Sequence, residues 1–473
     1  MSDAQYPSQC KLLKCTITTS DGSNPKLLGT DMILGFQWQE NLMSPFCGGS
    51  MTISDSKNFI TSYPIKGGEN LKFEVETVWE EEPIVFELKC FSVSGRLLNG
   101  KTQVYQMNLI SEEALINETI KVQSRLDGDP QAIIGTLLEK YIKTTKEYFA
   151  EPSRFKIKYN PAQKRPFDII AKLTKQFVSA KTNFGDPTTS TTEDTEETKE
   201  EIKGSAGCFF WESRRGYNCF SVDALCDVEG GTFATPELNS ETWGPYVEQI
   251  ANTDQAGDSR FNVIGFQVSG EVNIMHSLRK GQYSQLMVFF NHSTGKYSEY
   301  LYKVKESYGE MSHLGGQDAV SLVPTNGEEL TNKYSRISSR ILDHESWFND
   351  ISIADPEDPN AENPTEYADW VKYYAAQSTT RYNLLTNQEA VLKIPGNPYI
   401  CAGDKIEIML QSKSSDEERK EEPFDKETSG IYLVKEATHA FNFLDGTSGF
   451  VNTTLRLFRD SYGSKVEPSE HGN

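Results

Sequence analysis

The chain has 473 residues, 37% of them apolar, which is enough for several hydrophobic cores, so we expect about three or four domains. Its formal net charge of −21 argues against nucleic-acid binding, because neutralising a phosphate backbone requires clustered Lys and Arg. Residues 1–15 lack the apolar core of a secretory signal, and the sequence has no apolar run long enough to span a bilayer. We therefore expect a soluble protein without membrane insertion.

Residues 11–112 show the alternation of apolar and polar side chains that is typical of half-buried β-strands. The alternating segments, separated by glycine-containing turns, are residues 33–38, 50–53, 71–77, 84–93 and 103–109. Several short strands at this spacing predict a small barrel or sandwich. We assign this first β-domain to residues 1–112.

The pattern then changes to a helical period. Asp129 and Pro130 predict a helix start, followed by apolar residues at helical spacing, and a second helix is predicted to begin at Pro166. These helices predict a small helical domain in residues 113–204. Within it, residues 187–203 are acidic and poor in apolar side chains, so we expect a linker or surface loop there.

Two further regions show strand patterns. Residues 208–222 predict a tight hairpin with aromatic-rich strands around the turn at 212–216. Alternation returns near the end, in residues 405–410, 431–440 and 450–460, with a polar loop at 412–427. Three consecutive strands favour a barrel sheet, because an isolated hairpin is barely stable alone.

Residues 229–389 separate these two regions. Strands are expected at 263–275, 285–291 and 297–304, and a helix is expected from Glu366 to about residue 379. Residues 465–473 are expected to form a flexible tail.

The final segments resemble a known family. Their order is PG, a short apolar turn, GD, an alternating strand, a polar loop, G-x-Y-x-V, H-x-F, a turn and a strand ending in Arg. This order resembles the end of the central hub protein of contractile-tail phage baseplates of the T-even type. The phrases SMTISDSKNFI, IKGGENLKFEV and KCFSVSG resemble the family's first barrel, DPQAIIGTLLEKYI and RPFDIIAKLTKQF its helices, and FFWESRRGYNCFS the hairpin that opens its second barrel.

The resemblance implies a β-rich, multidomain α+β fold. Two small antiparallel β-barrels, similar to tail-tube domains, accompany a helical domain and an inserted α+β domain. The second barrel is implied to be discontinuous, formed by residues 205–228 and 390–464. The inserted domain occupies residues 229–389, where RKGQYSQLMVFFNHSTGKYSEYLY and ILDHESWFND resemble the family.

The resemblance also implies a structural role in the virion, after synthesis in the host cytoplasm. Three chains would place six barrels in a pseudo-sixfold ring that joins the hexameric tail tube to a trimeric, lysozyme-bearing spike. A closed trimer can also pair barrel edges that would otherwise stay open. Tube-initiator and other baseplate proteins are further expected partners, and DNA only passes through the channel. Candidate interface residues are Trp38, Trp211, Tyr217, Arg456 and Arg459, although core packing explains the aromatic ones equally well.

The sequence predicts no catalytic, cofactor or metal site. Asp343, His344 and Glu345 could meet residues 355–358 around a metal, but a solvated acidic loop is the favoured interpretation. His439 is predicted to be a hydrogen-bonded structural residue. The eight cysteines never form C-x-x-C and are predicted to be reduced core thiols. Two rival hypotheses are a type VI or phage spike protein, and a β-rich tail hydrolase or carbohydrate-binding protein.

Overall fold

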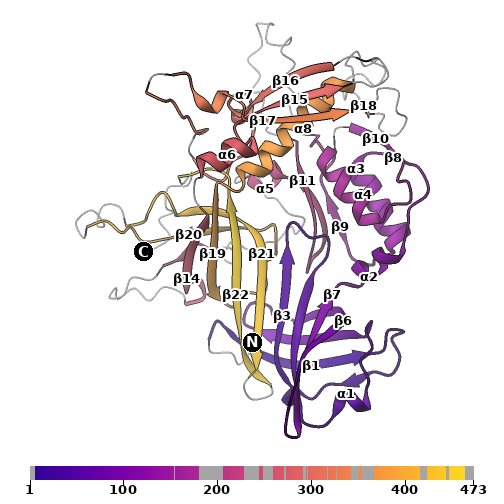
Figure 1. Cartoon of the computed structure of the whole chain (residues 1–473). Helices are drawn as coiled ribbons and strands as arrows, with labels where there is room; N and C mark the ends of the chain where they lie inside the picture. The colour runs from indigo at the N-terminus through magenta and orange to yellow at the C-terminus, as the bar shows by residue number, and fades with distance from the viewer. Residues whose placement is uncertain are drawn as a thin grey trace.

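The computed structural model is β-rich with several helices and is divided into several packed units (Figure 1). It describes residues 6–153, 155–180, 206–227, 244–248, 259–270, 273–290, 295, 297–316, 318–325, 327–341, 351–353, 367–415, 423–443 and 447–463. The predicted linker at 187–203, the acidic segments at 343–345 and 355–358 and the tail at 465–473 lie outside these ranges. Within them, no helix has both the length and the apolar composition needed to cross a bilayer.

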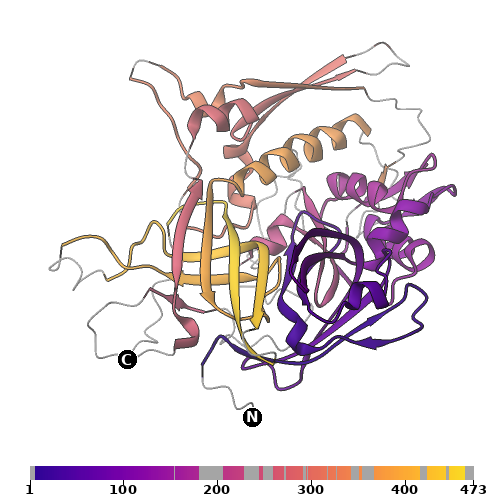
Figure 2. The same ribbon diagram turned by 60° about the horizontal axis from the view of Figure 1, so that its bottom comes forward.

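Most strands belong to one 13-stranded sheet, and eight of them pair in a closed circuit. In circuit order these eight are β1 (Gln9–Thr18), β5 (Asn70–Thr77), β6 (Ile84–Asn99), β7 (Thr102–Ile110), β4 (Gly48–Asp55), β3 (Ile33–Asn41), β21 (Gly430–Phe443) and β22 (Ser448–Arg459). The circuit closes where Gln9 of β1 pairs with Phe450 of β22. Every pairing in it is antiparallel. The strands predicted within residues 33–109 are therefore confirmed, and they curl around a common interior (Figure 2).

That interior is filled with aromatic side chains. Phe36, Phe73, Phe86 and Phe441 are buried, and their ring centroids lie between 4.3 and 6.3 Å apart. Each comes from an inward-facing position of a different strand, as alternation requires. The interior of the first circuit is therefore filled by side chains and leaves no channel through it.

A second circuit lies beside the first. Its strands are β13 (Tyr246–Val247), β20 (Lys405–Met409), β21, β22, β19 (Gln388–Pro395) and β14 (Gly265–Gly270). Val247 at one edge also bridges to Asn262, just before β14, so the two edge strands meet. This circuit has its own core, which includes Leu392, Ile406 and Leu455.

The hairpin β21–β22 belongs to both circuits. On β21, residues 430–433 pair with β20 and residues 436–442 pair with β3. On β22, residues 452–459 pair with β19 and residues 448–450 pair with β1. The register shifts between Val434 and Glu436, where β21 passes from one circuit to the other. The last predicted strands are thus confirmed, and both are long enough to serve two sheets.

The predicted hairpin at 208–222 forms, as β11 (Cys208–Ser213) and β12 (Gly216–Ser221), but the expectation that it supplies strands of the second barrel is wrong. It pairs with β9 (Tyr148–Ala150) in a separate three-stranded sheet. All twelve residues of β11 and β12 are buried, and Arg214 and Arg215 in the turn between them are partly exposed. Such strands need cover on both faces, which a barrel wall does not provide.

Helices cover this small sheet (Figure 1). They are α2 (Glu112–Thr119), α3 (Pro130–Thr136) with a π-helical continuation (Leu137–Ile142), and α4 (Pro166–Leu173), with α5 (Val222–Cys226) following the hairpin. Both predicted helix starts are confirmed. Asp129 occupies the N-cap position, but its side chain makes no capping hydrogen bond. Beside them lies a sheet of β8 (Leu126–Gly128), β10 (Phe155–Tyr159) and β18 (Ile351–Ile353).

The segment between the hairpin and β19 forms a third region. Its sheet has the order β16 (Tyr297–Lys303), β15 (Ser284–Phe290), β17 (Arg336–Ile341), and α8 (Tyr367–Leu384) packs against it. The strand predicted at 263–275 is only half right, because β14 ends at Gly270 and α6 (Ile274–Lys280) begins soon after. The remaining short elements are α1 (Phe59–Ser62), α7 (Val304–Ser307), β2 (Lys26–Leu27) and 3-10 turns at Thr30–Met32, Thr174–Gln176, Ser259–Phe261, Tyr308–Glu310 and Leu330–Asn332.

Candidate functional site: a buried polar junction between the circuits

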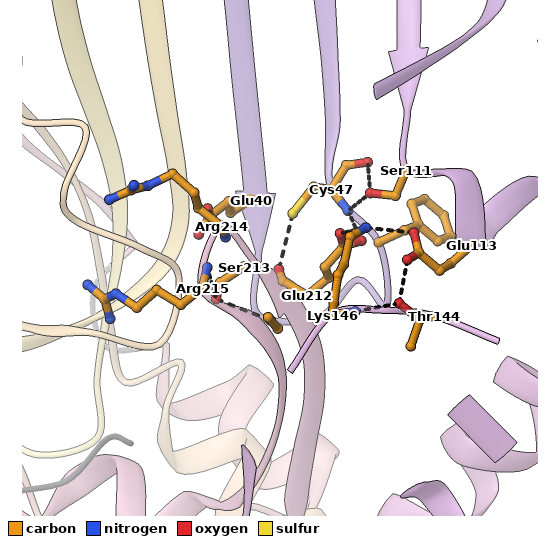
Figure 3. Close-up of polar contacts among 12 residues, drawn as sticks. Glu40, Cys47, Ser111, Glu113, Thr144, Lys146, Glu212, Ser213, Arg214 and Arg215 are labelled. Carbon is orange, nitrogen blue, oxygen red and sulfur yellow. Dashed lines mark hydrogen bonds and ion pairs between the residues drawn. The ribbon is translucent and has the colours of Figure 1, made fainter. Parts of the chain in front are cut away.

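The turn between β11 and β12 lies where both circuits and the helical region meet (Figure 3). We call the polar residues gathered around it the junction: Glu40, Cys47, Ser111, Glu113, Thr144, Lys146, Glu212, Ser213, Arg214 and Arg215. The turn is tight because Gly216 has φ +133°, and a Cβ there would lie 2.5 Å from the carbonyl oxygen of Glu147. Only glycine fits at this position.

Lys146 stands at the centre of the helical side of the junction. Its Nζ lies 2.6 Å from Glu113 Oε2 and 2.6 Å from Glu212 Oε1 (Figure 3). The second oxygen of Glu212 accepts the backbone N–H of Cys47 at 2.9 Å. Burial alone would lower the pKa of Lys146, but the two carboxylates outweigh it and hold that pKa above its usual range. The ammonium therefore stays charged and ties α2 to β11, and Glu212 extends this link to Cys47, just before β4.

Glu40 connects the first circuit to both the hairpin and the second circuit. Its carboxylate accepts Trp38 Nε1 at 2.9 Å, the backbone N–H of Arg214 at 2.7 Å and that of Ala402 at 3.0 Å. Its side chain is buried, and burial raises its pKa against the lowering effect of these donors. Because the three donors come from three different segments, their relative positions are fixed by one side chain.

The two arginines of the turn reach opposite circuits. Arg214 forms an ion pair with Glu80, in the connection between β5 and β6, at 2.5 Å. Arg215 donates two hydrogen bonds of 2.8 Å to the two carboxylate oxygens of Asp404, just before β20. It also donates to the carbonyl of Tyr399 at 2.9 Å. The turn thus joins the two circuits through its arginines. The bidentate pair of Arg215 with Asp404 fixes the orientation of the two groups as well as the distance between them.

A second buried cluster joins the third region to the end of β22. Arg381 of α8 donates to Asp460 at 2.7 Å, lies 3.2 Å from Asp223 and donates to the carbonyl of Ser312. His313 Nδ1 lies 2.8 Å from the same Asp460 carboxylate. Burial alone would raise the pKa of Asp460, but Arg381 and His313 outweigh it and hold that pKa far below its usual range. The charges therefore persist in the interior.

Four of the five sequence-predicted interface residues are buried within the chain. Trp38 donates to Glu40, Trp211 Nε1 donates to the carbonyl of Ala402 at 2.8 Å, and Tyr217 stacks on a neighbouring ring. Arg459 is also buried and donates to the carbonyl of Glu427 at 3.0 Å. These side chains pack their own chain, the alternative that the sequence left open for the aromatic residues. Arg456 is 63% exposed, and its role at an interface stays a prediction.

The charged residues of the junction were missed by sequence reasoning. The chain has 115 charged side chains, and nothing in the sequence distinguishes these few from the others. They also come from segments far apart in the chain. The one local signal was the turn 212–216, which places three charged residues between strands of aromatic residues. Charges flanked on both sides by core residues have to be paired.

His439 lies on the shared strand β21, and its structural role is confirmed. It is buried, and its ring nitrogens lie 3.0 Å from Thr453 Oγ1 and 3.0 Å from the carbonyl oxygen of Ile400. Burial lowers its pKa from 6.5 to about 4, partly opposed by the Ile400 carbonyl. All eight cysteines are also buried, and none is in a disulfide. The described residues contain no cluster of potential metal ligands.

The His439 shift predicts a pH dependence of stability. In the unfolded chain His439 binds a proton below about pH 6.5, whereas in the folded chain it becomes protonated only near pH 4. Stability is therefore full above pH 6.5 and falls by about 3 kcal/mol from this group as the pH drops toward 4. Urea unfolding of the wild type and of His439→Gln at pH 7, 6, 5 and 4 measures it. The variant should lose this component of the slope, and equal slopes would contradict the prediction.

No family model matches the sequence, and no curated protein matches it. The fold is similar to several solved structures. The tail protein from Neisseria meningitidis MC58 has a TM-score of 0.47 and 10% identity, over 94% of this chain and 96% of its own. The 43 kDa tail protein of prophage MuSo2 from Shewanella oneidensis has a TM-score of 0.48 and 9% identity, over 96% and 99%.

A third similar structure is the E. coli c3393 protein, a component of the type VI secretion system. Its TM-score is 0.39 and its identity 9%, over 93% of this chain and 76% of its own. These three structures are two tail proteins, one of them from a prophage, and a component of the type VI secretion system.

Proposed function

We propose that this chain is the structural hub of a phage tail baseplate. The observation that carries the proposal is the pair of strand circuits that share β21 and β22 within one chain. We interpret them as the two tube-like barrels that the sequence resemblance implies. Three chains would then supply six barrels, which adapts a threefold assembly to a sixfold one.

In this proposal the trimer joins the hexameric tail tube on one side and the trimeric spike on the other. DNA would pass along the threefold axis, because the aromatic core of the first circuit leaves no passage inside it. The acidic balance of −21 per chain would keep DNA from adhering to the channel. The role is structural, and it requires no catalytic residue or cofactor.

The junction suits this role. A hub placed between tube and spike carries load when the tail contracts, and the two circuits must keep their relative orientation. Arg214 and Arg215 hold the circuits from one turn, and Glu40 binds three segments at once. Buried charge-assisted bonds have narrow geometry, so they resist rotation better than apolar packing alone.

The proposal predicts a trimer. Light scattering after size exclusion should give a mass of about 160 kDa, three times the 53.2 kDa of the chain, alone or with a spike protein added. Leu13 and Val85 are 40% and 44% exposed on β1 and β6, the two strands of the first circuit that pair with β5. Val85 pairs with Glu74 of β5, and Leu13 lies at the register shift next to Lys14, which pairs with the same Glu74. The double variant Leu13→Asp and Val85→Asp should shift the mass toward the monomer.

Val323→Asp is the matched control, because Val323 is an apolar residue 64% exposed in the third region. It should leave the mass unchanged. A wild-type chain that stays at 53.2 kDa under both conditions would contradict the proposed trimer.

A further inference from the structure

Within the described ranges, the three-stranded sheet of the third region is covered on one face. Met287, Phe289 and Tyr302 are buried in a core that also contains Ala375, Ala376 and Leu384 of α8. Figure 2 shows this helix beneath the sheet. The alternate residues form the opposite face, where Leu286 pairs with Leu301 on one side and with Ile337 on the other. Further along, Phe290 pairs with Ile341. These apolar residues form a stripe that reaches all three strands and is interrupted between its two rows, where Val288 pairs with Glu299 and with Ser339.

The stripe is most exposed at β17. Ile337 is 63% exposed and Ile341 72%, against 37% for Leu301 and 41% for Phe290. β17 pairs with β15 on one side, and within the described ranges no strand pairs with its other side. An edge strand of this kind presents unpaired backbone N–H and C=O groups, which accept another strand.

The same edge is basic, in a chain that is strongly acidic overall. Arg336 and Arg340 lie on β17, and Arg279 and Lys280 form the last turn of α6 beside it. Arg336 donates to the carbonyl of Lys280 at 3.1 Å, which holds the strand against the helix. None of the four cations has a carboxylate partner among the residues that the structure describes. Arg279 and Lys280 complement the negative end of α6, but Arg340 has no such role.

The apolar and the basic residues of β17 lie on opposite faces of the sheet. Successive side chains of a strand point to opposite faces, so Ile337 and Ile341 lie on the apolar face while Arg336 and Arg340 lie on the other. A strand added along β17 would continue both faces. Its apolar residues would extend the stripe, and its alternate residues would stand beside the arginines.

We propose that β17 is a docking edge for an extended segment of a partner protein in which apolar and acidic residues alternate. Backbone bonds to the edge would supply affinity, and the alternation would supply specificity. The edge is present in the single chain, so the site does not depend on the trimer.

The probe is a fluorescein-labelled eight-residue peptide of alternating Glu and Val, titrated with the whole chain and followed by fluorescence anisotropy. We expect saturable binding, and no binding of the matching Lys–Val peptide. Arg340→Glu should weaken binding by about tenfold, whereas Arg456→Glu, an exposed arginine on β22, should not. Ile337→Asp should also weaken binding, whereas Leu98→Asp, at a site 73% exposed on β6, should not.

Hydrogen exchange distinguishes strand addition from a contact between charges alone. With the Glu–Val peptide bound, backbone amides of residues 336–341 should exchange more slowly, because the edge is then paired. The proposal is overturned if neither peptide binds, if the two peptides bind equally, if Arg340→Glu binds like the wild type, or if the amides of β17 gain no protection.

Discussion

Replacing Arg381 by Met should lower the free energy of unfolding by about 3–5 kcal/mol. Arg381 and Asp460 are both fully buried, and Asp223 is 3% exposed. Without the guanidinium, the carboxylates of Asp223 and Asp460 would remain in the interior and lose the cation that now contacts both of them. Urea unfolding of the whole chain, followed by tryptophan fluorescence, measures the loss.

The control is Arg456→Met on β22, the strand that ends just before Asp460. Arg456 is exposed and lies 3.8 Å from Glu436, so its loss should cost no more than about 1 kcal/mol. The pair of variants compares the same chemical change in a buried and in an exposed site. Equal effects would show that the buried cluster contributes no more than a surface ion pair.

Replacing Lys146 by Met should destabilise the chain by about 2–4 kcal/mol at pH 7. This is less than for Arg381→Met, because Lys146 is partly exposed. Glu113 and Glu212 would then face each other without the ammonium between them. Burial already raises the pKa of Glu212, and the loss of Lys146 would raise it further. A carboxyl with a raised folded pKa contributes stability at low pH that disappears as the pH rises. The deficit of the variant should therefore shrink between pH 7 and pH 5.

The double variant Lys146→Met and Glu212→Gln is the control for this mechanism. Removing the charge of Glu212 together with its partner should make the double variant more stable than Lys146→Met alone at pH 7. It should also abolish most of the pH dependence of the deficit. A double variant that is less stable than the single one would show that unpaired charge is not the cause.

Local patterns in the sequence predicted most of the elements but few of their partners. The helix starts at Pro130 and Pro166 and the hairpin at 208–222 depend on neighbouring residues, and the structure has them. The passage from β14 to α6 was missed, although Asn273 caps that helix by accepting the N–H of His276 and Gly281 ends it. Asn273 was therefore a readable helix-start signal within the predicted strand.

The pairing of strands could not be predicted because the alternation of one strand does not identify its neighbour. The residues of β21 show one regular pattern, yet its two halves pair with different strands. The placement of the hairpin with β9 has the same cause, since aromatic residues on both faces of its strands predict burial but not the covering element. The junction follows from these pairings, and so it was accessible only from the structure.

The position of β22 has a consequence for how the protein is made. β1 is among the first strands to leave the ribosome, yet its partner β22 is among the last, and the backbone N–H of Leu12 bonds the carbonyl of Thr447 at 2.7 Å. Until the final hairpin is synthesised, β1 and β3 each present an open edge, and pairings of such long sequence separation form slowly. We therefore expect nascent or truncated chains to aggregate through these edges unless a chaperone covers them.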